Sequence, residues 1–119
     1  MSRVPKKKLG DCFKVAFHNL REHGYRLVHA IVTGQGKIAG IQYSHAFNIT
    51  EVEIAPGIKI DMVVDKSNGL DVQLPVGAYF RLGNITLYRE YSQTQAYEKV
   101  VDTGTYGPWD AEIITNDLN

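Results

Sequence analysis

The sequence predicts an α+β domain in which an N-terminal helix and a late helix pack on a mostly antiparallel sheet. Three observations support this class. Apolar residues recur at helical spacing directly after Asp11, several short β-rich runs then follow one another with turn residues between them, and a capped helical segment comes late in the chain. The chain has 119 residues, 44% hydrophobic and 22% charged, which suits one globular core.

The first helix is predicted over residues 12 to about 22. Asp11 is a suitable N-cap and Gly24 a suitable C′ residue. Four apolar residues recur at i, i+3, i+4 and i+7 on one face: Phe13, Ala16, Phe17 and Leu20. We expect residues 1–10 to form a flexible N-terminal arm, and 11–119 to form a single domain.

Short β-rich runs between turn signals predict the sheet. The predicted strands cover 26–33, about 38–49, 58–65 and 85–91. Within 70–83 the sequence indicates no more than a short helix over 76–82. Ser92 and Gln95 form a near capping box for a late helix that runs to about Thr103 and ends at Gly104.

The only cysteine, Cys12, is predicted to be the first residue of the first helix. A thiol at that position is close to the positive end of the helix dipole, which favours the nucleophilic thiolate. A lone cysteine can equally be a buried packing residue. One cysteine excludes an internal disulfide framework and fits a reducing cytoplasm.

A cysteine nucleophile needs a base, and the base needs a third group to orient it. The chain has four histidines: His18, His23, His29 and His45. The first two belong to the first helix and its end, where we expect them to be solvated. His29 lies in an apolar strand, where a core histidine with its hydrogen bonds satisfied is the usual explanation. His45 lies mid-strand between small residues, which leave room for a substrate.

Asp65 ends the strand that follows His45, and two adjacent antiparallel strands can place the two residues side by side. We expect the carboxylate on Nδ1 of His45, with Nε2 directed outward. Asp61 shares the face of Asp65 and is the reserve orienter.

The order of a helix-start cysteine, a strand histidine and an aspartate on the next strand resembles the papain-like superfamily, especially its transglutaminase-like branch. It also looks like small uncharacterised bacterial and phage proteins with the same layout. The segments that carry the resemblance are 10–16 (GDCFKVA), 27–30 (LVHA), 43–47 (YSHAF), 64–69 (VDKSNG) and, loosely, 106–109 (YGPW).

The resemblance implies a minimal papain-like (transglutaminase-like) core and an amide-cleaving cysteine hydrolase, a peptidase, amidase or deamidase, with a transferase as the variant. It also implies a triad of Cys12 as nucleophile, His45 as base and Asp65 as orienter. The chain departs from the family in lacking a glutamine in residues 1–11. Backbone N–H groups near Cys12, or a donor such as Tyr43 or Gln42, would then have to stabilise the oxyanion. Phe47 also stands where the branch usually has tryptophan.

Two other functions stay open. A binding or inhibitor module would suit the seven tyrosines, Trp109 and the net charge of zero. A metal site would have to use His29, His45 and Asp65, although no compact ligand spacing supports it.

The neutral net charge and the lack of a long apolar segment lead us to expect no nucleic-acid or membrane partner and a cytoplasmic location. We expect a peptide or protein substrate and no cofactor. The oligomeric state is left open by the sequence.

Overall fold

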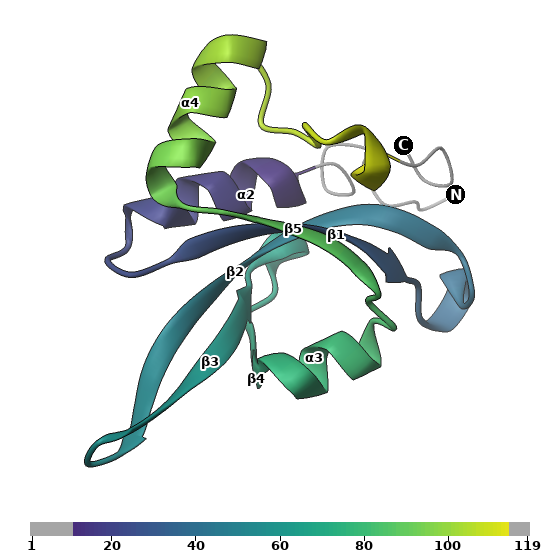
Figure 1. Ribbon diagram of the computed structural model, residues 1–119. Helices are drawn as coiled ribbons and strands as arrows, with labels where there is room; N and C mark the ends of the chain where they lie inside the picture. The colour runs from purple at the N-terminus through teal and green to yellow at the C-terminus, as the bar shows by residue number, and fades with distance from the viewer. Residues whose placement is uncertain (1–10, 115–119) are drawn as a thin grey trace.

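The computed structural model describes residues 11–114, and the expected N-terminal arm lies outside them. Within these residues the chain is α+β, with a five-stranded antiparallel sheet in the order β4-β3-β2-β1-β5 and three α-helices (Figure 1). The helices and strands are α2 (Cys12–His18), β1 (Arg26–Thr33), β2 (Gln42–Ala55), β3 (Ile58–Asp65), β4 (Val72–Pro75), α3 (Val76–Leu82), β5 (Leu87–Tyr91) and α4 (Gln93–Thr103). Four short 3-10 turns join them: η1 (Asn19–Arg21), η2 (Gly36–Ile38), η3 (Ser67–Gly69) and η4 (Ala111–Ile113).

Most of the predicted elements are confirmed. The bounds of β1, β3 and α3 agree with the prediction, and α4 has both the capping box at Ser92 and the left-handed Gly104. The first helix is shorter than predicted, because α2 ends at His18 and continues as the 3-10 turn η1. Strand β2 starts and ends later than predicted, because η2 and the turn after it precede Gln42, and β5 begins at Leu87 rather than at 85. Strand β4 was not predicted; it is a four-residue edge strand that ends in proline, which edges tolerate.

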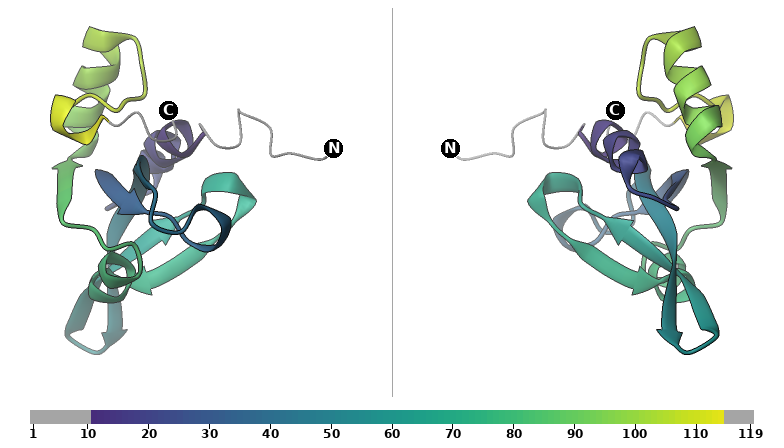
Figure 2. Two further views of the ribbon diagram at one scale, coloured as in Figure 1. Left: turned by 90° about the vertical axis from the view of Figure 1, so that its right-hand side faces the viewer. Right: turned by 90° about the vertical axis from the view of Figure 1, so that its left-hand side faces the viewer.

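Helices cover both faces of the sheet (Figure 1; Figure 2). Helices α2 and α4 lie on one face and α3 on the other. Each face has its own buried cluster. The cluster under α2 and α4 contains Cys12, Phe13, Ala16, Leu20, Leu27, Ala46, Tyr91 and Ala96. The cluster under α3 contains Val28, Ala30, Val32, Phe47, Ile49, Val63, Tyr79 and Ile85.

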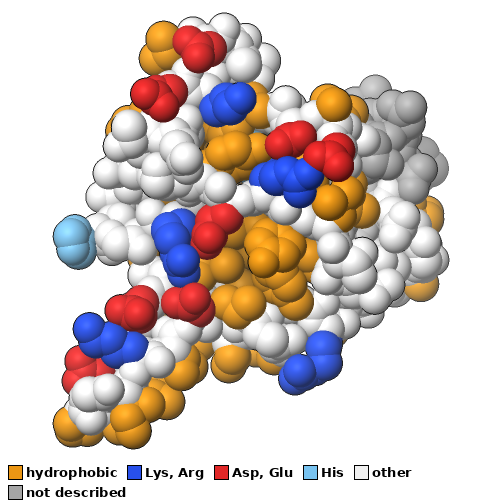
Figure 3. Space-filling model, in the orientation of Figure 1, with side chains coloured by type: hydrophobic (Ala, Val, Ile, Leu, Met, Phe, Trp, Pro, Cys, Tyr) orange, Lys and Arg blue, Asp and Glu red, His pale blue; other side chains and the backbone are white. Residues whose placement is uncertain are grey.

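The β2–β3 hairpin extends beyond the rest of the sheet (Figure 1; Figure 2). Strand β1 pairs with β2 only over residues 42–49, and β4 pairs with β3 only over 62–65. Charged side chains and apolar side chains occupy different sides of this hairpin, and Ile54 and Ile58 are exposed (Figure 3). None of the helices in residues 11–114 has the length and apolar character needed to cross a membrane.

The early end of β3 creates room for a site at the edge of β2. Pairing of β2 with β3 stops at Asn48 and Val64, so Asp65 lies diagonally across from His45 and residues 42–47 have no strand neighbour on that side. Helix α2 contacts both β2 and η3 at this edge. The first residue of α2 can therefore approach β2 from the side on which β3 has ended.

Candidate active site

Cys12 begins α2 and is 4% exposed. Asp11 occupies the N-cap position as predicted, but its side chain makes no capping hydrogen bond, so that part of the prediction is wrong. The reason is its helical backbone (φ −87°, ψ −7°), whereas a capping side chain folds back from an extended N-cap residue. The carbonyl of Asp11 instead accepts the N–H of Val15 at 2.8 Å.

Asn48 fastens α2 to the sheet. Its buried side-chain amide donates to the carbonyl oxygen of Ala16 in the helix at 2.9 Å and to that of Arg26 in β1 at 3.2 Å. Its Oδ1 accepts from the side chain of Asn19 at 3.2 Å. Buried polar groups are costly unless they are paired, so these bonds specify where the helix lies on β2. Asn48 thereby sets the position of Cys12 relative to β2.

His45 and Asp65 meet at 2.7 Å, from Nε2 to Oδ2, and both residues are 8% exposed. The structure corrects the expected geometry, because Nε2 rather than Nδ1 faces the carboxylate. Asp65 lies diagonally across from His45 on the neighbouring strand, so the imidazole reaches it with its far nitrogen. Cys12 is close enough to His45 to raise the pKa of the imidazole, and Nδ1 is the nitrogen left for that interaction.

Asp65 accepts four hydrogen bonds. Its Oδ2 receives Nε2 of His45 and the hydroxyl of Tyr79 at 2.6 Å. Its Oδ1 receives the backbone N–H of Ser67 at 3.1 Å and the Ser67 hydroxyl at 2.7 Å. Asp61, the reserve orienter, instead forms an ion pair with Arg26 at 3.2 Å on the surface. Asp65 is therefore the carboxylate that the structure places on His45.

The electrostatics of the site favour a charged imidazole. Burial alone lowers the pKa of His45, but the hydrogen bonds to Asp65 and Cys12 and their negative charges outweigh it and raise the pKa to about 10. Burial acts to raise the pKa of Asp65, yet the pairing with His45 and the bonds from Tyr79 and Ser67 hold it well below its ordinary value of 3.8. At neutral pH the pair is an imidazolium and a carboxylate.

A cavity of about 190 Å³ opens beside this pair. Its walls are Val32, Thr33, Gln35, Tyr43, His45, Asp65, Ser67, Asn68, Leu70, Tyr79, Leu82 and Gly83. Of the two candidate oxyanion donors outside the backbone, Tyr43 lies in this wall with its ring 6.0 Å from that of His45. Gln42 is exposed and is not among the lining residues.

Ser67 and Tyr79 also bond Asp65, and the sequence did not predict that they belong to the site. Ser67 has a local signal, because an aspartate often accepts the N–H two residues further along the chain. Tyr79 is a core residue, but its hydroxyl also reaches Asp65 from 14 positions away. Nothing in the local sequence around Tyr79 indicates that contact, since it depends on how α3 packs on the sheet.

His29 is buried as predicted, but its hydrogen bonds are not satisfied. Both ring nitrogens lack a partner within the described part of the chain. In β1 His29 pairs with Ala46, so it lies on the α2 face while His45 lies on the α3 face. The two histidines cannot share one metal ion, and residues 11–114 contain no group of three metal-ligating side chains.

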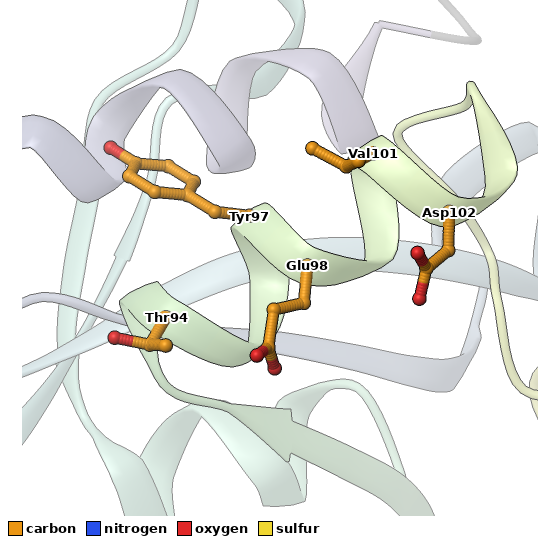
Figure 4. A pocket seen from close by; sticks show the side chains of 5 residues that line it. All are labelled: Thr94, Tyr97, Glu98, Val101 and Asp102. Carbon is orange, nitrogen blue, oxygen red and sulfur yellow. The ribbon is translucent and has the colours of Figure 1, made fainter.

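A larger pocket of about 590 Å³ lies along α4, away from this site (Figure 4). Its side chains are Thr94, Tyr97, Glu98, Val101 and Asp102. They include no cysteine or imidazole, so the pocket offers no nucleophile or histidine base. The smaller cavity is the one lined by His45 and Asp65, although Cys12 is not among its lining residues.

No protein-family model, curated protein or solved structure matches this chain.

Proposed function

We propose that this protein is a thiol-dependent acyl-transfer enzyme of the papain-like, transglutaminase-like kind. Cys12 is the nucleophile, His45 the general acid and base, and Asp65 the residue that orients His45. One observation carries the proposal: a buried imidazole lies close enough to the only cysteine to be affected by it electrostatically, and is hydrogen-bonded to a carboxylate that itself accepts three further bonds. A nucleophile, a base and an orienter in contact are what this chemistry requires.

The reaction proceeds in two steps. The Cys12 thiolate attacks the carbonyl carbon of an amide, forming a C–S bond, while the His45 imidazolium donates its proton to the departing nitrogen as the C–N bond breaks. In the second step water, or an amine, loses a proton to His45 as it attacks the thioester. The C–S bond breaks and Cys12 leaves as the thiolate. Water yields a carboxylic acid and an amine acceptor yields a new amide.

Asp65 supports both steps without changing its own charge. Its carboxylate accepts Nε2–H, which leaves Nδ1 directed at Cys12 and stabilises the imidazolium that exists between turnovers. The oxyanion would be held by backbone N–H groups near Cys12 or by Tyr43, which lines the cavity. The proposed substrate is the amide of a peptide or protein.

A second function is favoured by the burial of Cys12. A nucleophile that is 4% exposed needs a substrate to reach it along the His45 edge, whereas a binding module needs no such access. In that case the hydrogen-bonded triad would stabilise the fold, and the protein would bind a partner without turnover. The two functions differ in the reactivity of Cys12.

The rate of Cys12 alkylation by iodoacetamide against pH tests the proposal. Because the chain has one cysteine, the labelling reports on Cys12 alone. We expect fast labelling well below pH 8, and a fall of about tenfold at pH 7 in His45→Ala, since a thiol without an imidazolium partner is only a few per cent ionised there. His23→Ala, which removes an exposed histidine, is the matched control and should label like the wild type.

Turnover supplies the second readout. We expect hydrolysis of p-nitrophenyl acetate that is lost in Cys12→Ala, with an alkaline limb near pH 10 where His45 loses its proton. Slow labelling that is indifferent to His45, together with no ester hydrolysis, would refute the enzyme and leave the binding module.

A further inference from the structure

The side of Asp65 that meets His45 also receives a tyrosine. Tyr79 in α3 donates its hydroxyl to Oδ2 of Asp65 at 2.6 Å, and the same oxygen lies 2.7 Å from Nε2 of His45. We infer that Tyr79 is a positioning residue, which holds the Asp65 carboxylate in the orientation that pairs Oδ2 with His45. The inference rests on the proposed function, and it makes α3 part of the site.

The Asp65 carboxylate needs other residues to fix its orientation because of its position at the end of a strand. Asp65 is the last residue of β3, and the chain turns away directly after it through η3. Ser67 fixes Oδ1 from within that turn. Oδ2 has no donor from that turn, so without Tyr79 its only partner would be His45, and the Ser67 bonds would hold the carboxylate at Oδ1 alone. A carboxylate that rotates no longer orients the imidazole.

Tyr79 is suited to this part in charge and in rigidity. Burial and the neighbouring Asp65 charge raise its pKa well above its usual range, so the hydroxyl keeps its proton and stays a donor. Its ring is buried and packs 4.7 Å from that of Phe47, two residues along β2 from His45. Phe47 thereby ties the two donors of Oδ2 to one strand, which keeps their spacing constant.

The test is Tyr79→Phe, which removes one oxygen atom and keeps the ring. Its matched control is Tyr88→Phe, since Tyr88 packs on Phe80 of the same helix but makes no bond to Asp65. We expect Tyr79→Phe to lower the rate of Cys12 alkylation at pH 7 several-fold and Tyr88→Phe to leave it unchanged. The NMR titration of the His45 ring should shift down from about pH 10 toward 6.5, because Asp65 no longer holds Nε2.

A double-mutant cycle separates positioning from packing. In an Asp65→Asn background Tyr79→Phe should change the alkylation rate by less than about twofold, because a residue that acts through Asp65 has nothing left to orient. A residue that acts by filling the core would produce the same fall in both backgrounds.

Three results would overturn the inference. The first is a Tyr79→Phe variant that labels and titrates like Tyr88→Phe. The second is an additive cycle. The third is an upward shift of the His45 titration, which would mean that Tyr79 competes with His45 for Oδ2 rather than holding Asp65 in place. Failure of the proposed function is distinguishable, because slow labelling would then be seen already in the wild type.

Discussion

Two histidines on the neighbouring strands β1 and β2 are buried alike and yet have opposite electrostatics. In the register His29 pairs with Ala46, and Ala30 pairs with His45, so the two are one step apart on opposite faces of the sheet. His45 bonds Asp65 and Cys12, and its pKa rises to about 10. His29 is 0% exposed and has no hydrogen-bond partner among the described residues, and burial lowers its pKa to about 3.

The difference teaches that partners, not burial, decide the charge of a core imidazole in this fold. Desolvation disfavours the imidazolium at both positions. At His45 the hydrogen-bonded Asp65 carboxylate and the nearby Cys12 favour the imidazolium and outweigh that desolvation. Around His29 the neighbours are aromatic rings, from Phe13 at 4.8 Å, Tyr91 at 5.0 Å and Trp109 at 4.7 Å, which supply neither. The imidazole on one face is held charged, and the imidazole on the other face stays neutral.

Removing the carboxylate should make His45 resemble His29. We expect Asp65→Ala to lower the free energy of unfolding by about 3–5 kcal/mol, because the variant leaves a buried imidazole and the Tyr79 hydroxyl without their acceptor. The pKa of His45 should fall well below 10, because burial disfavours the imidazolium and only Cys12 remains to offset it. Urea denaturation and NMR titration measure the two effects.

Asp61→Ala is the control for that change, since it breaks a surface ion pair with Arg26 and should alter stability by less than about 1 kcal/mol. A His45 that still titrates near pH 10 in Asp65→Ala would contradict the role given to the carboxylate.

Gly107 offers a way to disturb the packing around His29. Gly107 has φ +113°, and a Cβ there would lie 2.5 Å from Cε1 of His29. We expect Gly107→Ala to destabilise the fold by about 1–3 kcal/mol through backbone strain and this clash. Gly104 also has a positive φ, +73°, but an open Cβ position, so Gly104→Ala should be the milder change. Thermal unfolding compares the two.

If the clash between the new Cβ and the His29 ring contributes to the destabilisation, His29→Ala should reduce it. In that background, the loss of free energy of unfolding caused by Gly107→Ala should no longer exceed that caused by Gly104→Ala. An excess that persists in that background would show that the backbone alone is responsible.

The smallest effect at neutral pH is expected for His29→Leu. Replacing a buried imidazole that has no partner by an apolar side chain should be neutral or stabilise by up to about 1 kcal/mol at pH 7. The effect of His29→Leu on the free energy of unfolding should be larger in acid. The folded-state pKa of His29 lies below its ordinary value of 6.5, so its contribution is present above pH 6.5 and is lost as the pH falls toward 3.

The loss is at most about 1.4 kcal/mol per pH unit for one proton. Asp65 also loses stabilisation in acid, below its ordinary value of 3.8, so the difference between wild type and His29→Leu isolates His29. Unfolding measured at pH 7, 5 and 4 checks this. Parallel stability curves for the two proteins would contradict it.

Much of the fold follows from local patterns. Turn signals and β-rich runs marked β1 and β3 as strands of the sheet, and the Ser92 capping box and Gly104 marked the ends of α4. These patterns are readable because they depend on residues two to four positions apart. The weaker predictions were those that a few residues cannot decide, such as β4, whose four residues become a strand through pairing with β3.

The candidate site likewise has features that the sequence predicted and features that it did not. The residue types Cys12, His45 and Asp65 were identified from the sequence, and so was their order. The nitrogen that faces Asp65 was predicted wrongly, because it depends on β3 ending opposite Phe47 rather than beside His45.

By itself, then, the sequence determined the elements, their faces and the chemical groups available for a site. The tertiary structure decided which groups touch. It directed Tyr79 and Ser67 to Asp65, and it surrounded His29 with aromatic rings in place of hydrogen-bond partners. The physical reason is that periodicity and capping act over one or two turns of chain, whereas a pKa is set by whichever groups pack within a few ångströms, however distant they are in sequence.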